Sequence, residues 1–228
     1  MIATICLLWK PSGGIPQGVV PPFLFSSADI QAIIREARSI GRKGEFRPHV
    51  YSTLLGLLAC TGLRISEGLN LKLDDVTPDG LVIRRTKFGK SRLLPLHPTV
   101  WRQLETYLER RLKVAGACEY VFVSMGGKNL TRGTIYQLFT RITEKLGLVS
   151  GAGKSGPRLH DLRYHFAIQS LERSSGDHAG ISRHMVALAT YLGHSDMKDS
   201  YYYLEATPAI LSAIAARCED HFYGEGSV

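Results

Sequence analysis

The chain has 228 residues, of which 44% are hydrophobic and 21% are charged, and its formal net charge is +8. These values fit one globular domain of ordinary size, whose core needs neither disulfides nor a structural metal. They exclude a low-complexity chain, and no internal repeat is found.

The positive charge is unevenly distributed along the sequence. Residues 199–228 carry five acidic side chains and one arginine, a net charge of −4, so residues 1–198 carry +12. A basic body with an acidic tail favours a polyanion as the partner of the body and a protein contact for the tail. A soluble basic protein with no such partner is the alternative.

The four cysteines are far apart in the sequence and form no C-x-x-C pair. Zinc ligation is therefore not expected, and a reduced cytoplasmic setting is the default. The apolar run IATICLL near the start is too short to span a bilayer, and no small-residue cleavage site follows it. We predict neither a membrane anchor nor a signal peptide.

The predicted elements begin after residues 1–25, which are rich in Pro and Gly and are predicted to form an extended arm or linker. Ser27 is expected to cap a helix that ends at Gly41, with an apolar face that includes Ile30 and Ile33. Pro48 is expected to start a second, fully buried helix that Gly62 ends.

A short helix, ISEGLNLKL, is expected next. The segments GLVIRRTK and SRLLPL are expected to form a β-hairpin with a tight FGK turn, and YVFVS a short extended piece. The remaining helices are expected over residues 98–115, 131–146, 158–172, 181–193 and 208–222. The predicted fold is mainly α with a small β-hairpin (α+β).

Four stretches contain side chains that are unusual for a helical domain: TGLRISE with Arg64, RRTKFGKSR with Lys87 and Lys90, LHDLRYH with His160 and Arg163, and LGHS with His194. Each has a structural interpretation. Arg64 would pair with Glu67, the two lysines would be solvated, His160 would cap a helix, and His194 would interact with a helix dipole.

Taken together, these motifs resemble the catalytic domain of the tyrosine recombinase, or phage integrase, family, over about residues 25–216. The resemblance rests on ATGLRxSE, GKxR-xxPL, LHDLR and LGHS in this order. It implies the DNA breaking–rejoining fold, a metal-independent DNA strand transferase without a cofactor, double-stranded DNA as a partner, and a homo-oligomer on DNA, a tetramer in synapsis.

The resemblance also assigns roles to residues. Arg64 and Arg163 become phosphate-clamping arginines, Lys87 the hairpin lysine, and His160 and His194 the two histidines. Lys90 and Arg92 are expected to bind DNA. The nucleophile of the family usually lies nine residues after the second histidine, which selects Tyr203.

The residue types fit this chemistry independently of the resemblance. Arginine forks bind phosphate oxygens in pairs and stay charged, so they stabilise a phosphoryl transition state as a metal would. A tyrosine hydroxyl, with a pKa near about 10, needs a base or a cationic field, which His160 and the arginines supply. Lys87 can give a proton to the departing 5′ oxygen.

The nucleophile lies within a run of three tyrosines, Tyr201, Tyr202 and Tyr203. Successive helix residues point about 100° apart, so one of the three faces a given phosphate. The geometry does not say which, and the spacing from His194 favours Tyr203. Packing or DNA backbone contacts are expected for the other two.

The predicted organisation is an arm (1–25), a catalytic domain (26–207), and a C-terminal helix and tail (208–228) that could dock onto a neighbouring protomer. The helical domain that usually precedes the catalytic part in this family is not expected here. A localisation at the nucleoid in the cytoplasm follows from the expected DNA substrate.

Three functions remain open at this point. The first is a site-specific recombinase or integrase of a mobile element. The others are a type IB topoisomerase-like enzyme and a catalytically limited fragment or DNA-binding relic that regulates the element. A two-metal nuclease is disfavoured, because the acids Asp74, Asp75, Asp161 and Asp196 do not form the paired carboxylates that it needs. His165 and His184 are expected to be surface or packing residues.

Overall fold

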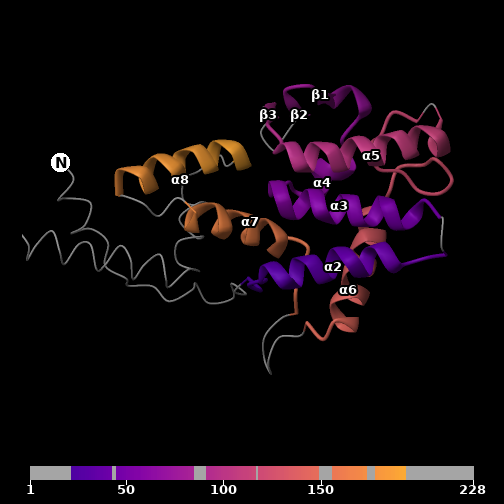
Figure 1. Ribbon diagram of the computed structural model, residues 1–228, viewed down its shortest axis with the longest axis horizontal. Coiled ribbons are helices and arrows are strands. Elements are labelled where there is room, and N and C mark those ends of the chain that lie inside the picture. Colours follow the sequence, from indigo (N-terminus) through magenta and orange to yellow (C-terminus); the bar gives the residue numbers. More distant parts are fainter. Residues whose placement is uncertain are drawn as a thin grey trace, which may run out of the picture.

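The computed structural model describes residues 22–42, 45–84, 91–116, 118–148, 156–173 and 178–193. Within these ranges it is mostly helical, with one small antiparallel sheet (Figure 1), as the sequence predicts. The predicted arm, the hairpin tip and the last helix lie almost wholly outside the described residues, so the expected domain boundaries stay predictions.

The first described helix is α2 (Ser27–Ser39), and its N-cap is the residue before it. Ser26, not the expected Ser27, caps it: the Ser26 hydroxyl accepts from the Asp29 N–H at 3.1 Å, and the Asp29 carboxylate accepts from the Ser26 N–H at 2.8 Å. This reciprocal capping box satisfies two helix N-terminal donors. The apolar face of α2 includes the buried Ile33 and Ala37.

Helix α3 (Arg47–Thr61) is the central helix of the domain and lies between α2 and α5 (Pro98–Ala115) (Figure 1). Its run LLGLLAC is buried on nearly all sides, which explains why it lacks an amphipathic pattern. The helix ends at Gly62, whose φ of 63° is left-handed, and the Gly62 N–H donates to the Leu58 carbonyl.

The sheet has three strands in the order β1 (Val76–Thr77), β2 (Gly80–Ile83), β3 (Arg92–Leu94). The predicted hairpin is confirmed in its paired part, where Ile83 lies opposite Arg92. The two-residue β1 was not predicted, because so short a strand has no alternation to detect. Before it come α4 (Ile65–Leu69) and the 3-10 turn η1 (Leu73–Asp75).

The second half of the domain is helical. The predicted YVFVS piece, which the structure describes in full, forms no strand: it bends at Val121 and Phe122 and makes isolated bridges, such as that of Val123 with Asn129. Helices α6, α7 and α8 follow, and α8 begins three residues earlier than expected. Their bounds are Arg132–Lys145, Asp161–Glu172 and His178–Leu192.

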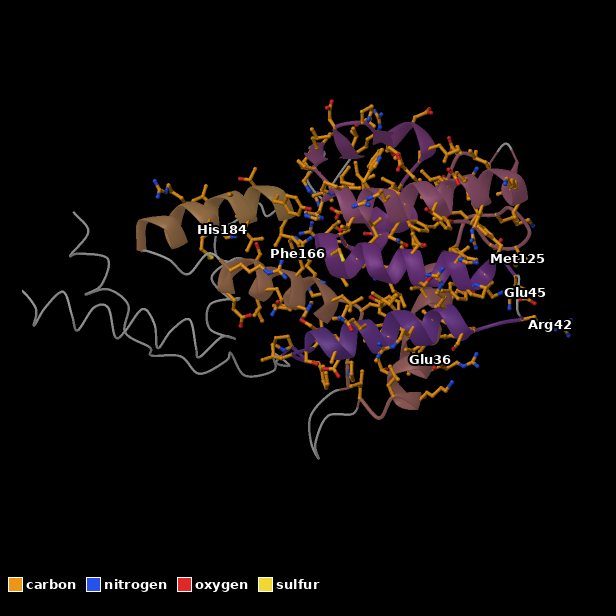
Figure 2. All side chains as sticks on the ribbon, in the orientation of Figure 1. Glu36, Arg42, Glu45, Met125, Phe166 and His184 are labelled. Atoms are coloured by element: carbon orange, nitrogen blue, oxygen red, sulfur yellow. The ribbon has the colours of Figure 1, made fainter. Side chains whose placement is uncertain are left out.

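Helices α7 and α8 pack through a small apolar cluster of their own, with Leu171, Met185 and Leu188 buried in it. Figure 2 shows Phe166 of α7 and His184 of α8 between these helices. His184 contacts the Ser170 hydroxyl at 2.9 Å, so it has the packing role that was expected. No described helix is long and apolar enough to cross a membrane.

Candidate active site

Arg64 lies at the junction between the end of α3 and the start of α4. The left-handed turn at Gly62 lets the chain leave α3, and Arg64 occupies the N-cap position of α4. Its N–H donates to the Glu67 carboxylate at 2.9 Å, and its Nη1 lies 3.3 Å from Glu67 Oε1. The predicted ion pair is therefore confirmed, but 29% of the Arg64 side chain is still exposed.

Arg92 binds the same carboxylate from the sheet. Its Nη1 and Nη2 donate to Glu67 Oε1 and Oε2 at 2.9 and 3.0 Å, and its Nε donates to the Tyr191 carbonyl at 2.9 Å. Only 12% of the Arg92 side chain is exposed. Burial would raise the pKa of Glu67, but hydrogen bonds from Arg92 and the Arg64 N–H, with the charges of both arginines, hold it below its usual value. Glu67 is therefore an ionised bridge between two arginines.

Arg163 is buried between three helices, on the first turn of α7. Its Nη1 donates to the Gly62 carbonyl at 2.6 Å, and its Nη2 donates to the Leu192 carbonyl at 2.8 Å. These carbonyls belong to the C-terminal ends of α3 and α8. These two bonds fix the orientation of the guanidinium.

His160 occupies the N-cap position of α7 but makes no side-chain capping bond, so the interpretation as a cap is wrong. Its ring packs edge-on against Tyr164, with the centroids 5.3 Å apart. The residue is exposed. Loss of solvent around the ring lowers the pKa of His160, and the charge of Arg163 lowers it further, with smaller effects from Arg158 and Arg64 against the opposite effect of Asp161.

The described structure therefore brings together three of the predicted catalytic residues, Arg64, His160 and Arg163. They come from the α3–α4 junction and the start of α7. Arg163 joins these two places through its hydrogen bond to the Gly62 carbonyl, two residues before Arg64, and His160 lies three residues before Arg163. Arg92, predicted to bind DNA, is described above, and the other predicted site residues lie outside the described residues: Lys87, Lys90, His194 and Tyr203. Their roles stay predictions.

The carboxylates near this site are engaged in structural contacts. Asp161 is fully buried and accepts from the Arg158 N–H at 2.8 Å and from its guanidinium at 2.9 Å. Asp75 accepts from the Lys72 N–H at 3.0 Å and pairs with Arg84. Among the residues that the structure describes, no His, Cys, Asp and Glu side chains form a group that could hold a metal ion.

Sequence reasoning missed two contributors to this site. It named Arg92 as a DNA contact and Gly62 only as a helix stop, whereas the structure places the Arg92 guanidinium on Glu67 and gives the Gly62 carbonyl to Arg163. A local signal existed for Gly62, because it ends a buried helix two residues before Arg64. None existed for Arg92, because its partners lie 25 and 99 residues away in the sequence.

Comparison with known proteins agrees with this arrangement. The sequence model of the phage integrase family matches residues 25–209. The integrase/recombinase y4rB of Sinorhizobium fredii is 37% identical over 219 residues, which cover 90% of this chain and 70% of that protein. Tyrosine recombinase XerA of Pyrococcus furiosus is 31% identical over 166 residues, 71% of this chain and 52% of XerA. The chain thus spans about half the length of that recombinase.

Solved structures show the same fold. The crystal structure of XerA recombinase has a TM-score of 0.68 at 23% identity and covers 86% of this chain and 65% of that one. The catalytic core of lambda integrase has a TM-score of 0.56 at 22% identity and covers 76% of this chain and 92% of that core. The predicted catalytic-domain fold is therefore confirmed, and the chain belongs to the phage integrase family, with the tyrosine recombinases.

Proposed function

We propose that this chain is a tyrosine-type site-specific recombinase of a mobile element, which cuts and rejoins double-stranded DNA through a 3′-phosphotyrosyl intermediate. The observation that carries the proposal is the convergence of Arg64, His160 and Arg163 on one site in a chain of the phage integrase family: Arg163 binds the Gly62 carbonyl beside Arg64, and His160 is the N-cap of the same helix as Arg163. In the transition state of phosphoryl transfer, the two arginines can bind the charged phosphate oxygens and the histidine can take up a proton.

In the proposed reaction, the Tyr203 hydroxyl gives its proton to His160, and its oxygen attacks a backbone phosphorus and forms a P–O bond. The bond from phosphorus to the 5′ oxygen breaks, and Lys87 gives that oxygen a proton. A 5′ hydroxyl from another strand then attacks the phosphotyrosine, which releases the tyrosine and reseals the DNA. The number of phosphate ester bonds is unchanged, so the cycle needs no ATP.

The described residues support the electrostatic part of this reaction. Arg163 is held in place by two carbonyls before any DNA arrives, so little reorganisation is needed when charge develops on the phosphate oxygens. Loss of one such donor typically costs about 3 to 4 kcal/mol of transition-state stabilisation. Loss of solvent around the ring and the charge of Arg163 lower the pKa of His160, which favours the uncharged imidazole that a general base needs.

The proposed partners are double-stranded DNA and further copies of the chain. Solved relatives of similar fold include XerH bound to its difH substrate and a lambda integrase tetramer bound to a Holliday junction. We propose the same class of substrate for this chain, and therefore a location at the nucleoid in the cytoplasm. The acidic residues 208–228 are the proposed docking segment, so deleting them should weaken assembly on DNA more than binding of one protomer. Equal losses would contradict that role.

Covalent capture tests the proposal. The purified chain is mixed in EDTA with supercoiled plasmid that carries the DNA flanking its own gene, and SDS-stable protein on DNA is measured. We expect an adduct that is lost in Tyr203→Phe and retained in the matched controls Tyr201→Phe and Tyr202→Phe. DNA binding is measured in parallel for all four proteins.

The outcomes separate the three candidate functions. Adducts with joining between two marked duplexes support the recombinase. Adducts with relaxed circles but no joining support the topoisomerase-like enzyme. DNA binding without an adduct contradicts both and leaves the catalytically limited fragment or the regulatory relic.

A further inference from the structure

Arg92 joins three parts of the site that are far apart in the sequence. It is the first residue of β3, it binds Glu67 of α4 with both Nη atoms, and its Nε binds the carbonyl of Tyr191 near the end of α8. The fit is tight, because a Cβ added to Gly193 would lie 2.8 Å from Arg92 Nη1. The guanidinium is thus enclosed by protein on several sides.

The way in which Glu67 is shared between two arginines determines what Arg64 is free to do. Arg92 takes both carboxylate oxygens at 2.9 and 3.0 Å, whereas the Arg64 side chain has one longer contact at 3.3 Å. A bidentate pair is the stronger of the two interactions. The negative charge of Glu67 is therefore largely matched by Arg92, and the Arg64 side chain remains partly exposed.

We propose that Arg92 is a positioning residue of the active site and not a DNA contact: it neutralises Glu67, so that Arg64 is available to a phosphate, and it fixes the end of α8 against the sheet. This inference rests on the proposed function. It also replaces our sequence-based expectation that Arg92 binds DNA.

The first measurement is the salt dependence of DNA binding. A lysine or arginine that contacts a phosphate contributes about one unit to the slope of log K against log salt. We expect Arg92→Gln to leave this slope unchanged and to lower the single-turnover rate of adduct formation at saturating DNA by about 100-fold, as misplacement of a catalytic group does. The matched control is Arg84→Gln, which removes an exposed arginine paired with Asp75 at the end of the neighbouring strand, and it should keep the parental rate.

A second substitution separates positioning from general damage. In Arg92→Gln the Glu67 carboxylate loses its main partner and is expected to draw Arg64 onto itself. Adding Glu67→Gln removes that charge but keeps an oxygen that can accept from the Arg64 N–H. We expect the double variant to form adduct at least about 10-fold faster than Arg92→Gln. Arg92→Lys keeps the charge that neutralises Glu67 but not the fork, so its rate should lie between those of the parent and Arg92→Gln.

Specific results would overturn the inference. A slope reduced by about one unit in Arg92→Gln, with a parental rate at saturating DNA, would make Arg92 a phosphate contact. A double variant no faster than the single would show that Glu67 does not restrain Arg64. If Arg92→Gln fails to fold, Arg92→Lys and its combination with Glu67→Gln answer the same two questions. Failure of the proposed function would give a different result, because the parent protein itself would then form no adduct. The interaction between Glu67 and Arg92 could still be measured as the non-additivity of their substitutions in the free energy of unfolding in urea.

Discussion

The substitution Gly62→Ala tests quantitatively how tightly the turn after α3 packs against α7 and α8. The backbone of Gly62 has a φ of 63°, and a Cβ there would lie 2.7 Å from both Leu192 Cδ2 and Phe166 Cδ1. A left-handed conformation costs a non-glycine residue about 1–2 kcal/mol. Forcing extra volume into a packed interior costs about 1–3 kcal/mol. We therefore expect the free energy of unfolding to fall by about 2–5 kcal/mol.

Gly147, after α6, provides a matched control. Its φ is 66°, and a Cβ there would meet no atom within 4 Å, so Gly147→Ala isolates the backbone cost. Urea denaturation of the parent and both variants gives the comparison. We expect Gly62→Ala to lose at least about 1 kcal/mol more than Gly147→Ala. Equal losses would refute the claim that the α3–α4 turn is packed against α7 and α8.

Gly62→Ala also tests function, because the Gly62 carbonyl accepts from Arg163 at 2.6 Å. A shift of this carbonyl would move a proposed phosphate clamp. At a temperature where the variant is folded, the rate of adduct formation should fall while the affinity for DNA changes little. A folded variant with the parental rate would show that this carbonyl does not position Arg163.

Two further predictions concern stability. Arg111 is fully buried and donates to the carbonyls of Tyr120 and Gly116, so Arg111→Met should lower the free energy of unfolding by at least about 3 kcal/mol. The control Arg110→Met removes an exposed side chain and should lower it by less than about 1 kcal/mol. Equal shifts of the melting temperature in the two variants would contradict this prediction. The pKa of His160 is lowered below 6.5 in the folded chain, so the unfolded chain binds more protons just below that pH, and the free energy of unfolding should fall as the pH drops from about 6.5. His160→Gln should show a smaller fall between about pH 7.5 and 5.5 in urea titrations, and an unchanged fall would count against the shift.

Features of the fold that depend on local pattern could be predicted from the sequence. The apolar periodicity of α2, the buried run in α3 and the two apolar runs of the hairpin each specify their own element. The Arg64–Glu67 pair was also within reach, since residues three apart at the start of a helix are neighbours. The family motifs then indicated which polar residues belong to the site.

Contacts between distant segments could not be predicted in this way. Arg111 follows Arg110 in a helix whose sequence pattern is amphipathic. The Arg111 side chain is nevertheless buried, because the loop after α5 brings carbonyl oxygens to its guanidinium. Arg92 occupies a strand position whose side chain could equally face solvent. Its burial depends on the arrival of Glu67 and of the end of α8, and no local pattern records either.

The end of α8 shows how the fold prepares the site before DNA is bound. The last carbonyls of a helix lack partners within the helix and carry partial negative charge. Arg92 donates to Tyr191 and Arg163 donates to Leu192, so two guanidinium groups satisfy neighbouring carbonyls of that last turn. Arg163 also holds the end of α3, and Arg92 also holds Glu67 beside Arg64. One pair of arginines therefore fixes both helix ends and the strand against one another, and moving α8 away from the site would break bonds at both arginines together.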